Sequence, residues 1–160
     1  MRGGVLVTGA GTGLGLEIAL TLAARGFAVY ASVPEAGQRP AVEEAAAQRG
    51  VTVQTPLLDV TDPANGEAVV RTIAMSDEGL FAVVHNAGVS LRGYFEDCDD
   101  AEIRRVFEVN FFGALAVTRA ALPHLRAARG GRLVFITSIG GRIASMARTA
   151  YCASKFALGG

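Results

Sequence analysis

The sequence has few cysteines, no excess of charge of either sign and no long uninterrupted apolar run. Its two cysteines, Cys98 and Cys152, have neither the spacing of a metal site nor that of a disulfide framework. Isolated cysteines are typical of a reducing compartment, so we expect a cytoplasmic protein with no metal centre.

The charges exclude one class of partner. The 15 basic and 15 acidic residues cancel, and no basic block is present, so nucleic acid and anionic membranes gain no electrostatic attraction. No apolar run approaches the length of a membrane span, and the first residues enter a strand-like segment at once, which leaves no room for a signal peptide. We therefore expect a small-molecule ligand, no nucleic acid and no membrane.

The composition and the apolar patterning predict one α/β domain over residues 1–160. Hydrophobic residues make up 51%, enough for a core in one domain of this length. Helices are expected between strands, at residues 14–25, 41–49, 63–75, 99–128 and from 148 onward. The strands are expected at residues 4–8, 27–33, 51–57, 80–84 and 133–136. This alternation predicts a doubly wound, Rossmann-like parallel sheet with strand order 3-2-1-4-5.

A glycine-rich turn follows the first expected strand. The pattern G-x-G-x-x-G fails, because a motif that starts at Gly9 would end on Leu14. The pattern T-G-x-x-x-G-x-G fits, from Thr8 to Gly15. Glycines allow a tight turn and close approach of a pyrophosphate to the N-terminus of the next helix. The turn thus predicts dinucleotide binding, and the alternative is a βα turn that binds nothing.

The form of the cofactor stays open between NAD and NADP. An acid at the end of the second strand would bind a ribose hydroxyl, but Val33 stands there. Glu35 and Arg39, just beyond, favour opposite answers. Asp59 follows the third strand and is either an acceptor for the adenine amine or the carboxylate at the next helix N-terminus.

Tyr151 and Lys155 lie four residues apart, so on a helix they share one face. An ammonium beside a phenol stabilises the phenolate, which suits proton transfer to and from an alcohol or carbonyl oxygen. The pair by itself is also compatible with an ordinary helix surface.

In combination, these motifs resemble the short-chain dehydrogenase/reductase family, in its order and at its spacing over nearly the whole chain. The matching features are Thr8-Gly9-x3-Gly13-x-Gly15, Asp59-Val60, Asn86-Ala87-Gly88, Asn110, Ser138 and Tyr151-x3-Lys155. The family has asparagine where this chain has His85, which we expect only to pack and hydrogen-bond.

The resemblance implies a role for each of these positions. Tyr151 would be the general acid/base, Lys155 would assist it and hold the nicotinamide ribose, and Ser138 would bind the substrate oxygen. Asn110 would hold a water that joins Lys155 to solvent. The implied catalytic residues are Asn110, Ser138, Tyr151 and Lys155. The implied cofactor-binding residues are Gly9, Gly11, Thr12, Gly13, Leu14, Gly15, Ser32, Asp59, Val60, Asn86, Ala87, Gly88, Tyr151 and Lys155.

The resemblance thus implies an NAD(P)-dependent alcohol dehydrogenase or ketoreductase that transfers a hydride between NAD(P) and an alcohol or carbonyl substrate. One alternative is a dinucleotide-binding module without catalysis, and a weaker one is a sugar-nucleotide epimerase or dehydratase, whose turn has glycine where Thr12 stands. The family continues beyond the tyrosine helix, so we expect a C-terminally truncated chain with an exposed apolar edge at residues 133–136. The full-length form is expected to be a homo-oligomer, a dimer or a tetramer.

Overall fold

The computed structural model describes residues 2–128 and 130–160, and its helices and strands follow the expected order, except that residues 51–57 form no regular strand. The strands are β1 (Arg2–Val7), β2 (Phe27–Ala31), β3 (Leu80–His85) and β4 (Arg132–Phe135). The helices are α1 (Gly13–Ala24), α2 (Arg39–Gln48), α3 (Pro63–Ala74), α4 (Asp100–Phe107), α5 (Gly113–Ala127) and α6 (Thr149–Gly159).

All four strands are parallel, in the order β2-β1-β3-β4. The predicted third strand, residues 51–57, lies beside β2 where the expected order places it, but it pairs only at two isolated bridges, Tyr30 with Gln54 and Val33 with Leu57. Pro56 lacks a backbone N–H and cannot donate to a ladder, which accounts for part of this irregularity. The predicted topology is confirmed, with an irregular segment as its outermost member.

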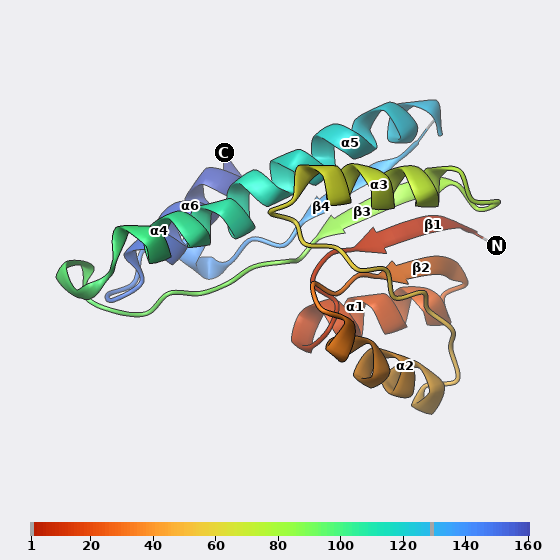
Figure 1. Cartoon of the computed structure of the whole chain (residues 1–160), viewed down its shortest axis with the longest axis horizontal. Coiled ribbons are helices and arrows are strands. Elements are labelled where there is room, and N and C mark those ends of the chain that lie inside the picture. Colours follow the sequence, from red (N-terminus) through yellow and green to blue (C-terminus); the bar gives the residue numbers. More distant parts are fainter. Residues whose placement is uncertain (1, 129) are drawn as a thin grey trace.

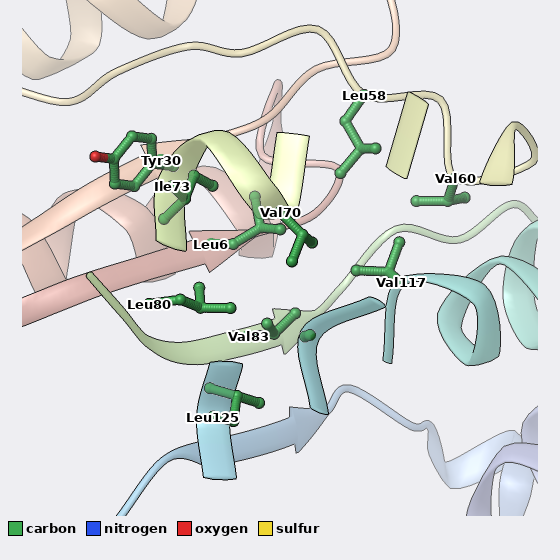
Figure 2. Packing of buried hydrophobic residues seen from close by; sticks show 11 residues of the cluster. Leu6, Tyr30, Leu58, Val60, Val70, Ile73, Leu80, Val83, Val117 and Leu125 are labelled. Carbon is green, nitrogen blue, oxygen red and sulfur yellow. The ribbon is translucent and has the colours of Figure 1, made fainter. Parts of the chain in front are cut away.

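Helices cover both faces of the sheet. Figure 1 shows α1 and α2 on one side and α3 and α5 on the other, with α4 and α6 beyond the carboxyl ends of the strands. The side chains under α3 and α5 converge between the layers (Figure 2), and they include Leu6, Val70, Val83 and Val117, each at most 1% exposed. Burying one such side chain contributes about 1.5–3 kcal/mol, so this double layer fixes the strand ends that carry the candidate site.

The long helix predicted over residues 99–128 is interrupted by a π-helical turn at Glu108–Phe112. The stretch Asp100–Ala127 is 28 residues long with a mean hydropathy of 1.2 in its most apolar window, so by length and composition it could cross a membrane, contrary to the expectation from the sequence. A helix that covers a sheet meets the same criterion, and Val117 and Ala121 of α5 lie in the core.

Candidate functional site

A cleft of about 1020 Å³ lies at the carboxyl ends of β1, β2 and β3, where a doubly wound sheet binds its ligands. Most of the residues predicted to bind a cofactor line it. They are Gly9, Gly11, Thr12, Gly13, Leu14, Gly15, Asp59, Val60, Asn86, Ala87 and Gly88.

The glycine turn is built by the absence of side chains. A Cβ on Gly9 would lie 2.7 Å from Cα of Ala87, and one on Gly15 would lie 2.5 Å from the carbonyl oxygen of Gly9. Gly13 has a φ of 56°, in the left-handed region, and its missing Cβ faces open space. Two glycines therefore permit close packing, whereas Gly13 keeps the approach to the α1 N-terminus open.

The segment after β3 clamps this turn. The side-chain amide of Asn86 donates to the carbonyl oxygens of Thr8 at 3.1 Å and Gly9 at 2.9 Å. In return, Oγ1 of Thr8 accepts from the backbone N–H groups of Asn86 and Ala87, both at 3.1 Å. The loops after β1 and β3 are thereby held as one rigid unit.

The structure places Ser32 and Asp59, two of the predicted cofactor-binding residues, in different surroundings. Ser32 is fully buried, its hydroxyl donates to the carbonyl oxygen of Val7 at 3.2 Å, and it is not among the residues that line the cleft. Asp59 does line the cleft, and its carboxylate accepts from Thr61. The cap of α3 is Asp62, which accepts from Ala64 and Asn65, so Asp59 is not the capping carboxylate.

The opposite wall was missed by the sequence interpretation. Ala101, Arg104 and Arg105 of α4 and Glu108 of the π turn line the cleft, and Glu35 and Gln38 line it from beyond β2. The spacing of 101, 104, 105 and 108 places them on one helical face, a pattern that the sequence does contain.

Tyr151 and Ser138 meet at a pair of glycines. A Cβ on Gly140 would lie 3.2 Å from Cε1 of Tyr151 and 3.5 Å from Oγ of Ser138, and one on Gly141 would lie 2.7 Å from the carbonyl oxygen of Lys155. The hydroxyl of Ser138 accepts from the N–H of Gly140 at 3.1 Å. The turn that carries Ser138 therefore packs against α6, and both Ser138 and Tyr151 lie beside Gly140.

Lys155 is 5% exposed and lies beside the end of the cleft. Its ammonium donates to the carbonyl oxygen of Ile136 at 2.9 Å and lies 3.5 Å from the Cβ position of Gly88, a residue of the cleft lining. Burial lowers the pKa of Lys155 below its ordinary value. A single backbone carbonyl leaves further donor capacity on this ammonium for a ligand.

Asn110 stands on the π turn and is 1% exposed. Its Oδ1 accepts from the N–H of Val89 at 2.7 Å, and its Nδ2 donates to the carbonyl oxygen of Val89 at 2.9 Å and to Oγ of Ser154 at 3.0 Å. The same Oδ1 lies 3.3 Å from the Cβ position of Gly88, beside Lys155. The structure thus brings Asn110 next to Lys155 and Ser138 near Tyr151. Lys155 and Tyr151 lie one turn apart on α6.

His85 is not among the residues that line the cleft. Its ring stacks on Phe135 with centroids 4.5 Å apart, and its Nε2 lies 2.9 Å from Oγ1 of Thr118. Its Nδ1 is buried without a hydrogen-bond partner among the described residues. Burial lowers the pKa of His85 to about 4, so the ring is neutral near pH 7. The expectation of a packing, hydrogen-bonded histidine is confirmed.

Two loops flank Ser138 and Tyr151 and carry exposed apolar side chains. The N–H of Gly93 donates to the carbonyl oxygen of Ala147 at 3.0 Å, which joins the loop after β3 to the loop before α6. The exposed apolar side chains on these loops include Tyr94, Phe95, Ile139, Ile143 and Met146. Within residues 2–128 and 130–160, no group of His, Cys, Asp and Glu is arranged to hold a metal ion.

Comparisons with known proteins agree with these motifs. A model of the family described as short chain dehydrogenase matches residues 4–160. Human retinol dehydrogenase 8 is 34% identical over 160 residues, covering 98% of this chain and 50% of that protein. The uncharacterized oxidoreductase YbbO of Escherichia coli (strain K12) is 35% identical over 159 residues, covering 99% of this chain and 57% of that protein.

A solved structure shows the same fold. The crystal structure of a short-chain dehydrogenase from Streptomyces avermitilis has a TM-score of 0.89 and 32% identity, covering 99% of this chain and 57% of that one. The chain spans about half the length of the curated relatives it matches. These relatives are dehydrogenases and oxidoreductases, and the dehydrogenases of their family use NAD or NADP. With the family model covering all but the first three residues, the chain belongs to the short-chain dehydrogenase/reductase family.

Proposed function

We propose that the protein of this chain is an NAD(P)-dependent alcohol dehydrogenase or ketoreductase. The observation that carries the proposal is that Asn110 and Lys155 lie beside Gly88 of the cleft lining, one turn of α6 from Tyr151. Tyr151 and Ser138 in turn both lie beside Gly140. The bound nicotinamide supplies hydride exchange with the substrate carbon, and the side chains supply proton transfer and orientation.

Each of the four side chains has a task in this proposal. Tyr151 exchanges a proton with the substrate oxygen, and Ser138, which also lies beside Gly140, hydrogen-bonds that oxygen. Lys155 of α6 points its ammonium toward Gly88 at the cleft, where it stabilises a phenolate and holds ribose hydroxyls. Asn110 positions the loop after β3 through both backbone groups of Val89 and faces Lys155 across Gly88.

The residues present fit a dinucleotide. Thr12 caps α1 with no side-chain hydrogen bond, and Gly13 leaves the helix N-terminus open, so a pyrophosphate meets backbone N–H groups and the positive end of the helix dipole. Asp59 lies in the lining for the adenine. Glu35 is the ionisable side chain that lines the cleft just beyond β2, whereas Arg39 is not among its lining residues.

The test is a pair of measurements on the whole protein. Titration of NADH and NADPH fluorescence measures binding, and reduced-nicotinamide absorbance follows turnover with a panel of secondary alcohols and ketones. The panel includes apolar compounds, because the flanking loops expose apolar side chains and one relative is a retinol dehydrogenase. Binding without turnover of any compound would support a dinucleotide-binding module instead, and absence of binding would end both interpretations.

We further propose that residues 1–160 form one cofactor-binding domain of a cytoplasmic homo-oligomer. The support for a homo-oligomer is an apolar surface on α4 and the π turn. Ile103, Phe107 and Phe112 line a hollow of about 290 Å³ there, and Phe112 is 49% exposed. Light scattering of the whole protein, compared with its Phe112→Glu variant, tests this. A monomer in both cases would contradict it.

A further inference from the structure

A buried serine lies between Tyr151 and Lys155 on α6. Ser154 is 0% exposed. Its hydroxyl donates to the carbonyl oxygen of Tyr151 at 2.8 Å, one turn back along the helix, and accepts from Nδ2 of Asn110 at 3.0 Å. A serine that bonds back into its own helix gains little helical stability from that bond. The bond from Asn110 is the contact that connects two separate elements.

The side-chain amide of Asn110 uses both of its N–H donors. Asn110 uses one Nδ2 hydrogen for the carbonyl oxygen of Val89 and the other for Ser154, and its Oδ1 accepts from the N–H of Val89. An amide has two hydrogens to donate, so every donor is satisfied only while the serine hydroxyl is present. Because Asn110 is 1% exposed, no bulk water replaces that partner.

Ser154 also completes the polar attachment of α6. Lys155, the next residue, donates to the carbonyl oxygen of Ile136 after β4, and Ser154 is bonded to the π turn. Tyr151 and Lys155 both stand on this helix, so any shift of α6 against the π turn moves both of them relative to Gly88 and the cleft. Van der Waals packing alone leaves small sliding motions of a helix possible, whereas a directional bond to a fixed amide opposes them.

We propose that Ser154 is a positioning residue of the active site, which fixes the turn of α6 between Tyr151 and Lys155 against the amide of Asn110. The inference rests on the proposed function. Ser154 touches neither substrate nor cofactor in this assignment, and it acts through the placement of Asn110, Tyr151 and Lys155.

The first test is kinetic and uses the whole protein. Ser154→Ala removes the hydroxyl with little change in volume, and we expect kcat to fall about tenfold, because small misplacements of reacting groups are costly. The affinity for NADH or NADPH should change less than twofold, since the glycine turn is untouched. Ser154→Cys keeps a weak donor and acceptor at this position and should recover part of the rate. If the alanine variant fails to fold, kcat of the Ser154→Cys variant provides the test instead.

A double variant separates positioning from general destabilisation. If Ser154 acts through Asn110, then adding Ser154→Ala to Asn110→Ala should cost little further rate, because coupled residues are not additive. Additive losses would overturn the inference. The matched control is Ser76→Ala, which removes a hydroxyl that also bonds back three residues, to Ile73 at 2.7 Å, and accepts from the hydroxyl of Tyr30. We expect normal kcat for it.

A second readout needs no turnover. In nuclear magnetic resonance spectra of the whole protein, the side-chain amide hydrogens of Asn110 should exchange slowly with water. In Ser154→Ala, one of the two should exchange faster, whereas in Ser76→Ala both should keep their rates. Unchanged exchange in Ser154→Ala, or an unchanged kcat, would overturn the proposal.

The outcomes also distinguish this inference from the proposed function. If Tyr151→Phe is inactive while Ser154→Ala has normal kcat, then only the role of Ser154 is wrong. If Tyr151→Phe keeps normal turnover, both assignments fail together.

Discussion

The two ends of the candidate site are built in opposite ways. At the glycine turn the chain leaves side chains out, and a Cβ at Gly9 or Gly15 would collide with backbone atoms. Around α6 the site is made of buried polar side chains. Asn110 of the π turn and Ser154 and Lys155 of α6 are each at most 5% exposed and hydrogen-bonded. In the proposed function, backbone groups bind the cofactor at the first end, whereas side chains would carry out the chemistry at the second.

This difference predicts how each end fails. A dinucleotide pyrophosphate binds to N–H groups that every residue has, so the turn depends on shape and tolerates no added bulk. Proton transfer depends on the identity of one functional group, so α6 tolerates changes of bulk better than loss of that group. Substitutions at the two ends should therefore separate cofactor affinity from turnover.

The largest effect is expected at Tyr151. Tyr151→Phe keeps the ring beside Gly140 and removes the hydroxyl, so kcat should fall at least ~10²-fold, the lower range for general acid/base catalysis. The affinity for the reduced cofactor should stay close to that of the unaltered protein, because the glycine turn is unchanged. Steady-state kinetics and fluorescence titration measure the two quantities, and a near-normal kcat would remove Tyr151 from its role.

A pair of glycines provides the reverse experiment. Gly13→Val should abolish dinucleotide binding, because its side chain would fill the open approach to the N-terminus of α1. A β-branched residue is strained at a φ of 56°, so this variant should also lose some stability, while circular dichroism still shows most of the fold. Gly15→Ala pushes a methyl group against the carbonyl oxygen of Gly9, and overpacking of this kind costs about 1–3 kcal/mol of stability. Fluorescence titration and urea unfolding of both variants measure affinity and stability. Retained dinucleotide binding in Gly13→Val would mean that the turn is only structural.

The sequence was sufficient for the glycine turn and for the order of the strands, whereas the roles of the side chains on α6 stay predictions. Strand, glycine turn and helix have local signals, and Asp62-Pro63 marked the start of α3 correctly. What the sequence did not predict depends on contacts between distant segments. The amide of Asn110 meets Ser154 only because a π turn and α6 pack together, and Ala101 and Arg105 reach the cleft only because α4 crosses it.

The strand predicted at residues 51–57 is less regular in the structure than the sequence indicates. Residues 51–54 alternate apolar and polar side chains, and residues 54–57 do run beside β2. Pro56 and the position at the sheet edge reduce the pairing to two bridges. The sequence left open whether Asp59 binds the adenine amine or stands at the N-terminus of α3. The structure assigns the cap to Asp62 and leaves Asp59 in the cleft.

His85 allows a smaller effect to be measured, on stability rather than on cofactor affinity or turnover. Because burial lowers its pKa to about 4 from 6.5, the unfolded chain binds this proton first as the pH falls, so stability is full above 6.5 and is lost toward 4. From about pH 7 to about pH 5 the loss should be about 2 kcal/mol. Urea unfolding of His85→Asn should show a shallower pH dependence, and His124→Asn is the control. Identical pH dependence in all three proteins would contradict the assignment.

The smallest effect is expected at Arg148, at the end of the site that depends on side chains. Its guanidinium carbon lies 5.5 Å from the centroid of the Tyr151 ring, and such contacts contribute about 0.5–1 kcal/mol where solvent reaches them. The ring is already placed by α6 and by Gly140, so Arg148→Met should lower kcat by less than about fivefold, and Arg148→Lys, which keeps a cation, by less still. Kinetics of the two variants beside Tyr151→Phe give the comparison. A loss from Arg148→Met as large as that from Tyr151→Phe would show that the guanidinium acts on the substrate itself, and the chemistry at this end would then require a second essential cation besides Lys155.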